Sequence, residues 1–347
     1  MNKLFNTAIV AFVSASLVFS SCTHHGNEDA PDVSKINLPY TSYPFYKDFA
    51  ALDTTHTAAA LTQLRNKYPE FTDFYLDTMF NFAYHRQYND TNSLMRVYLT
   101  SKDFRHHLDT LVTAFPNTKQ YDEKLQQSFK YLRYYDSSFD VPERVYYFPS
   151  FLAGGVNGSP TTLISAKEIG IAIDRFLGSD YVPYQQVSIP DFVTIRMNAD
   201  NIPVWVSMAI YEDKYRFDSY DKDLLNLMIQ KGKEMYFVEK LTPYLSDAVR
   251  FGFTKTQMEW CKKNEALIYN FLVQNQLLFD KNLQKTMRYV SDGPTAAGMP
   301  VESPGNVGSY LGWRIVKKYV EKHPVNMHQL FEISNAQEIL EGANYKP

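Results

Sequence analysis

The side chains best suited to metal chemistry are few and far apart in this sequence. Its 8 histidines include the adjacent His106 and His107 and a second pair, His323 and His328, on either side of Pro324. Neighbouring residues of a helix point about 100° apart, so His106 and His107 are badly placed to chelate one ion. The H-E-x-x-H pattern, which places two imidazoles and a glutamate on one helix face, does not occur. We therefore predict no bound metal and no cofactor.

Nucleophiles and carboxylates are equally dispersed. Cys261 falls on the apolar stripe of a predicted helix, which indicates a buried and inert thiol. Asp174, Asp180 and Glu212 have no spacing that would pair them for acid–base catalysis. Neither a G-x-S-x-G motif nor a glycine-rich phosphate loop is present. The formal net charge of −3 also argues against a nucleic-acid partner. These residues predict no catalytic site.

The N-terminus has the layout of a lipoprotein signal of a diderm bacterium. A short positive region at Met1-Asn2-Lys3 precedes an apolar stretch at 8–19 and then Ser20-Ser21-Cys22. That stretch is shorter than the ~18 residues of a membrane span. We predict that residues 1–21 are removed, that Cys22 carries a diacylglyceryl group with fatty acyl chains such as palmitate, and that the polar segment 22–39 is a flexible tether. A plain secretory signal with a chance cysteine is the alternative.

The remaining sequence predicts one α+β domain over 40–347, mostly α-helical with a small central β-sheet. Apolar residues recur at helical spacing from 40 to 135. The β-branched and aromatic run Arg144–Phe148 indicates a strand, and the short apolar runs at 161–165 and 169–173 indicate two neighbouring strands. A loop is predicted over 174–184, and helices resume after Pro190.

Several helix boundaries are predicted in the C-terminal half. Thr254 and Gln257 have the spacing of a capping box, so a helix should start there and continue past residue 271. Ser303 and Pro304 resemble an N-cap followed by a first-turn proline, with the helix extending to Lys322. Gly308 and Gly312 fall on one face of that helix, where glycine typically allows another backbone to approach closely.

Motifs along nearly the whole chain resemble the gliding motility lipoprotein GldB family of the Bacteroidetes. They are QLRNKYPEF (63–71), YYFP (146–149), IAIDRFLG (171–178), LNLMIQKGKEMYF (225–237), WCKKNE (260–265) and SPGNVGSYLGW (303–313). The resemblance implies an envelope lipoprotein with a part in gliding motility and type IX secretion. The motif residues to which it gives a structural role are Tyr147, Pro149, Asp174, Gly178, Gly232, Trp260, Glu265, Ser303, Pro304, Gly305, Gly308, Gly312 and Trp313.

The family is in turn similar to predicted zinc proteases with a zincin-like domain. In those proteins an H-E-x-x-H helix follows the sheet, and a glutamate–glycine pair on a later helix completes the metal site. The matching segments here are 204–208, which has no histidine or glutamate, and Lys231-Gly232, where a cation replaces the ligand. Zinc needs about three such ligands. The similarity therefore implies a degenerate zincin-like architecture, with a helical front half (40–140) and a zincin-like part (141–347).

The leading hypothesis for function is a non-catalytic envelope lipoprotein that acts in the assembly of the motility and secretion machinery. Its expected partners are the membrane, through the lipid anchor, and other envelope or secretion proteins. We expect the outer membrane, facing the periplasm, rather than the inner membrane. Two alternatives stay open: a periplasmic metallohydrolase with unrecognised ligands, and a lipoprotein that binds a glycan or peptide through its abundant aromatic side chains.

Overall fold

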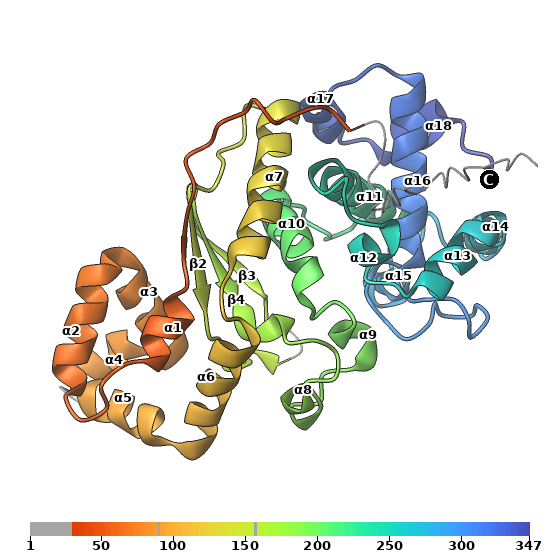
Figure 1. Cartoon of the computed structure of the whole chain (residues 1–347). Coiled ribbons are helices and arrows are strands. Elements are labelled where there is room, and N and C mark those ends of the chain that lie inside the picture. Colours follow the sequence, from red (N-terminus) through yellow and green to blue (C-terminus); the bar gives the residue numbers. More distant parts are fainter. Residues whose placement is uncertain (1–29, 89–90, 156–157) are drawn as a thin grey trace, which may run out of the picture.

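The structure is a computed structural model that describes residues 30–88, 91–155 and 158–347 (Figure 1). The predicted signal peptide, the acylation cysteine Cys22 and residues 23–29 of the predicted tether lie outside the described residues. Within the described residues the chain is mostly helical and contains one four-stranded sheet, so the α+β fold class is confirmed.

The sheet has the order β1-β2-β4-β3. The strands are β1 (Thr41–Tyr43), β2 (Arg144–Phe148), β3 (Thr161–Ser165) and β4 (Glu168–Ala172). β1, β2 and β4 are parallel, and β3 pairs with β4 in the antiparallel sense, as expected of two strands joined by a tight turn. The predicted strands are confirmed. The helical interpretation of 40–135 is wrong at its start, because β1 depends on long-range pairing with β2 rather than on a local pattern.

One face of the sheet is covered by the front helices, at the left of Figure 1. They are α1 (Phe45–Ala50), α2 (Thr57–Lys67), α3 (Pro69–Phe80), α4 (Phe82–Arg86), α5 (Thr91–Thr100) and α6 (Lys102–Ala114). Their shared core is aromatic and includes Phe71, whose ring stacks on Tyr146 of β2 with centroids 4.1 Å apart. Much of the chain's aromatic content is therefore used in packing.

The opposite face of the sheet packs against α7 (Lys119–Tyr135) and α10 (Ile202–Lys214), and α11 (Leu224–Leu241) packs on these two helices (Figure 1). The connection from β4 contains the 3₁₀ helices η2 (Ile173–Phe176) and η3 (Ala199–Asn201) and the short helices α8 (Val182–Gln186) and α9 (Asp191–Thr194). The loop predicted over 174–184 is therefore wrong in part. Its helical turns are too short to give a periodic pattern in the sequence.

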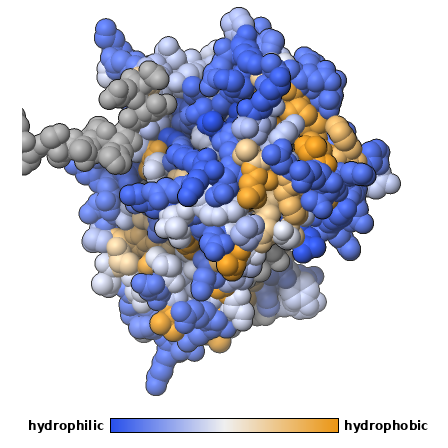
Figure 2. Space-filling model, turned by 90° about the vertical axis from the view of Figure 1, so that its right-hand side faces the viewer, coloured by the Kyte–Doolittle hydropathy of each residue, from blue (hydrophilic) through white to orange (hydrophobic). Residues whose placement is uncertain are grey.

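The C-terminal third of the chain is helical and packs mainly against α11. It comprises α12 (Asp247–Phe251), α13 (Lys255–Lys263), α14 (Glu265–Gln274), α15 (Leu283–Val290), α16 (Val307–Lys322), α17 (Met327–Glu332) and α18 (Ala336–Ala343). The capping box at Thr254 and Gln257 is confirmed, but the helix that it starts ends at Lys263, and α14 is a separate helix. The face at the right of Figure 1 is mostly hydrophilic with small hydrophobic patches (Figure 2).

The start of α16 differs from the prediction. The helix begins at Val307, and its N-cap is Asn306 in a left-handed conformation. The Ser303 hydroxyl instead accepts a hydrogen bond from the Ala296 amide at 3.2 Å. Gly305 donates its amide to the Gly293 carbonyl at 3.2 Å, so these residues fold back on a second loop. This long-range pairing prevents Ser303 from acting as the cap.

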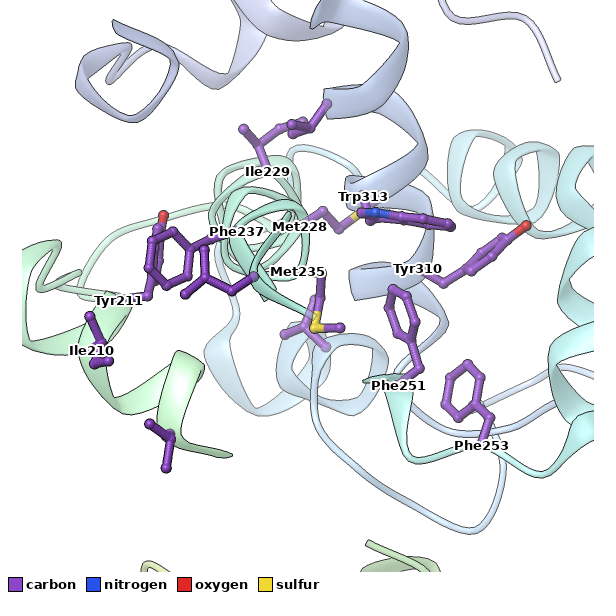
Figure 3. Packing of buried hydrophobic residues seen from close by; sticks show 14 of the residues in the cluster. Ile210, Tyr211, Met228, Ile229, Met235, Phe237, Phe251, Phe253, Tyr310 and Trp313 are labelled. Atoms are coloured by element: carbon purple, nitrogen blue, oxygen red, sulfur yellow. The ribbon is translucent and has the colours of Figure 1, made fainter. Parts of the chain in front are cut away.

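Helices α11 and α16 cross with their backbones almost in contact, at Gly232 and Gly312. A Cβ atom added to Gly312 would overlap the carbonyl oxygen of Met228, and one added to Gly232 would overlap the backbone of Gly312. Figure 3 shows the side chains of Met228 and Trp313 beside this crossing. A Cβ on Gly308 would likewise lie 2.8 Å from the Tyr289 carbonyl oxygen. The close backbone approach predicted for Gly308 and Gly312 is thus present.

Candidate functional site

Three adjoining cavities lie along one groove of the molecule. The first, of 420 Å³, is bordered by α9 and the loops at Gly252, Gly293 and Gly305. The middle cavity, of 320 Å³, shares Asp292 with the first and lies among α10, α11, α15 and the start of α16. The outer cavity, of 360 Å³, shares Glu212, among others, with the middle one. Together they form the candidate functional site.

A lysine bonded to two glutamates lines the middle cavity. Lys231 donates from Nζ to Glu234 Oε2 at 2.7 Å and to Glu212 Oε1 at 3.5 Å. Glu234 is 2% exposed at its side chain, whereas Lys231 is 38% exposed. Burial raises the pKa of Glu234, with the Glu212 charge adding to the effect, although Lys231 opposes both. Burial lowers the pKa of Lys231, but the two carboxylates outweigh it and hold that pKa above its usual value.

A second charged pair, Arg196 and Asp292, also lines the middle cavity. Arg196 donates from Nη1 to Asp292 Oδ2 at 2.8 Å, and Asn306 donates from Nδ2 to Asp292 Oδ1 at 3.1 Å. The Arg196 guanidinium also lies over the Trp205 ring, 4.8 Å from its centroid. Gly252 leaves room for this arrangement, because a Cβ there would overlap the Arg196 side chain. The guanidinium is therefore fixed in position beside the cavity.

Three buried polar atoms around the middle cavity have no hydrogen-bond partner among the described residues. They are Glu234 Oε1, Arg196 Nε and Asn306 Oδ1, and all three residues line that cavity. Buried polar atoms in proteins are nearly always hydrogen-bonded, because leaving one unpaired costs about 1–3 kcal/mol. Three such atoms around one cavity indicate a site suited to a polar guest.

The structure brings some of the residues considered in the sequence to this groove and keeps others away. Glu212 lies in it, together with Lys231 and with Trp205 and Met208 of the segment 204–208. Sequence reasoning overlooked Glu234, Arg196 and Asp292. Glu234 follows Lys231 by three residues on one helix, which was the only signal for it in the sequence.

Within the described part of the chain, the two histidine pairs lie on different elements of the fold, one pair on α6 and the other at α16 and α17. Among the described residues no group of three or more His, Cys, Asp or Glu side chains is arranged to hold a metal ion. His106 is exposed, His107 contacts Asp174, and His323 contacts the Gly342 carbonyl. His328 lies in α17, 3.3 Å from the Tyr215 hydroxyl.

Asp174 lies outside the groove, in η2 directly after β4, and is completely buried. It accepts hydrogen bonds from the Ser150 amide at 2.9 Å and the Leu152 amide at 3.1 Å, and its Oδ2 lies 3.2 Å from His107 Nε2. Burial raises the pKa of this carboxyl, but these partners outweigh burial and hold the pKa of Asp174 below its usual value. His107 belongs to α6, so the contact ties the front helices to the sheet. Asp180 is exposed.

Comparison with protein families identifies the chain. The model of the family described as gliding motility protein GldB matches residues 26–347. The chain belongs to the GldB family. This match confirms the resemblance seen in the sequence, and it makes the protein a gliding motility-associated lipoprotein of the cell envelope. A search of curated proteins gave no match to the chain, and a search of solved structures gave none either. Similarity to zincin-like proteases therefore stays a prediction.

No helix within 30–88, 91–155 or 158–347 of this GldB-family protein has the length and apolar character that crossing a membrane requires. Cys261 is completely buried on α13, and burial raises the pKa of its thiol to about 12. The thiolate needed for nucleophilic chemistry is therefore disfavoured at neutral pH.

Most GldB motif residues contact other parts of the core. Tyr147 donates to Asp122 Oδ1 at 2.9 Å, and Trp313 donates from Nε1 to Glu239 Oε2 at 2.7 Å. Glu265 accepts hydrogen bonds from two tyrosine hydroxyls, including that of Tyr345 near the C-terminus. The other motif residues pack or turn the chain: the Pro149 carbonyl accepts from Tyr75, Gly178 has a positive φ, Trp260 packs on the main core, and Pro304 and Gly305 line the first cavity.

Proposed function

We propose that this GldB-family lipoprotein is a non-catalytic binding component of the gliding motility and type IX secretion machinery, which holds a partner protein in its groove. The observation that carries the proposal is the bonding of Lys231 to Glu234 and Glu212. The Lys231 ammonium takes up one oxygen of each carboxylate, so neither glutamate is free to act as a bidentate metal ligand. The ammonium also repels a divalent ion nearby. A groove lined by both charged and apolar side chains is suited to binding a polypeptide.

Zinc content tests the non-catalytic part of this proposal. Protein purified without a histidine tag and without chelator is expected to contain less than about 0.1 equivalents of zinc and to melt at the same temperature with and without added zinc. The reason is that Lys231 stays protonated at neutral pH beside its carboxylates. Elemental analysis and thermal melting provide the measurement. About one equivalent of zinc, lost together with stability upon chelation, would contradict the proposal.

We also propose that the protein is anchored through Cys22 in the outer membrane, facing the periplasm. Two or three acyl chains, at ~0.8 kcal/mol per buried methylene, hold a protein stably on a bilayer. Cys22→Ala is therefore expected to leave an uncleaved precursor or a soluble periplasmic protein. Membrane fractionation and mass spectrometry of the N-terminus measure this outcome.

The matched control for the anchor is Cys261→Ala, which removes the other cysteine of the chain and should leave the protein in the membrane fraction. Wild-type protein recovered unmodified in the soluble fraction, with its N-terminus at another residue, would rule out acylation at Cys22. Separation of inner and outer membranes by density then tests the choice of membrane.

A further inference from the structure

We propose that the middle cavity receives the side chain of a lysine or arginine from an extended segment of the partner polypeptide. This inference rests on the proposed binding function and names the chemistry that the groove recognises. It is carried by three properties of the cavity: its unpartnered polar atoms, its charge balance and its apolar walls.

The unpartnered atoms match a cationic side chain and its peptide backbone. Glu234 Oε1 and Asn306 Oδ1 are acceptors, and an ammonium or guanidinium group offers several donors. Arg196 Nε is a donor, and a peptide carbonyl is its natural acceptor. A carboxylate-bearing guest would leave both acceptors unpaired and would face the charge of Glu234.

The charge balance of the cavity favours the same guest. Three carboxylates line it, those of Glu212, Glu234 and Asp292, against the two cations Arg196 and Lys231. One negative charge is therefore uncompensated within the cavity. Because Glu234 is almost completely buried, its interaction with a cation is screened less than a surface ion pair would be.

The remaining walls suit the stem of a long basic side chain. Met208, Met235 and Met287 line the middle cavity together with Trp205, Phe251 and Val290. Lysine and arginine bury their methylene groups against apolar surface while the charged head reaches polar atoms, and methionine adapts readily to such a stem. The first and outer cavities continue the groove on both sides, which leaves room for the residues that flank the basic one.

Pooled nonapeptides with one fixed central residue test this inference on the intact protein. We expect fluorescein-labelled pools centred on lysine or arginine to bind at least about tenfold more tightly, by fluorescence anisotropy, than pools centred on norleucine, glutamate or acetyl-lysine. In Glu234→Gln the preference for lysine over norleucine should fall below about threefold, since the charged acceptor is lost. The pool centred on acetyl-lysine tests the role of the peptide's charge, because acetylation removes the ammonium charge while the protein stays unchanged.

Glu321→Gln is the matched control, because Glu321 forms the same kind of pair with Lys318, three residues before it and 3.0 Å away, on the exposed side of α16. It should retain the full preference. Equal binding of lysine and norleucine pools to the wild type, or an undiminished preference in folded Glu234→Gln, would overturn the inference. The zinc measurement is independent of this outcome, so failure of the non-catalytic proposal and failure of lysine recognition are distinguishable.

Discussion

Replacing Gly312 with alanine is expected to destabilise the protein, although alanine is the better helix former. In a helix exposed to solvent the same change would gain up to ~1 kcal/mol. Here the new Cβ atom would overlap the carbonyl oxygen of Met228 on α11, and a backbone atom cannot rotate away as a flexible side chain can. We expect Gly312→Ala to cost ~1–3 kcal/mol and Gly312→Leu to cost more, because α11 and α16 must separate.

Urea unfolding of the purified variants measures this effect, and the sign of the alanine result is decisive. Lys318→Leu on the exposed side of the same helix is the control and should change the free energy of unfolding by less than about 0.5 kcal/mol. A stability gain in Gly312→Ala would mean that this face of α16 is open to solvent, contrary to the structure.

Replacing Asp174 with alanine is expected to cost about 2–5 kcal/mol of stability, since it removes a buried hydrogen-bond acceptor and each buried donor left unpaired costs about 1–3 kcal/mol. The carboxylate accepts the amides of Ser150 and Leu152, which would be left unpaired. It also holds a strained turn, because Phe151 and Leu152 both have positive φ angles, of 52° and 56°. Urea unfolding again measures the loss, and the exposed Asp180→Ala is the control.

The stability that Asp174 contributes should depend on pH in a defined direction. Its pKa is lower in the folded protein than its usual value, so ionised Asp174 stabilises the fold at pH values above about 4. That contribution should disappear as the pH falls through the folded pKa. The difference in unfolding free energy between wild type and Asp174→Asn should therefore shrink on acidification. A constant difference between pH 7 and pH 3 would show that the carboxylate acts without its charge.

Local sequence patterns predict the local features of this protein. The β-branched and aromatic run at Arg144–Phe148 predicted β2, because residues of these types favour a strand through their local preference alone. The capping box at Thr254 and Gln257 fixed the start of α13 for the same reason. The motifs that resemble the GldB family also lie in the sequence, and the family match over 26–347 confirms them.

Other features depend on contacts between distant parts of the chain and are visible only in the folded protein. β1 exists because it pairs with β2, which lies about a hundred residues later in the sequence. Ser303 fails to cap α16 because the loop that contains it pairs with Gly293. The groove combines Arg196, Lys231 and Asp292, whose spacing carries no periodic signal. Their charges act together because folding brings them around one largely buried cavity, where unpaired polar atoms are costly.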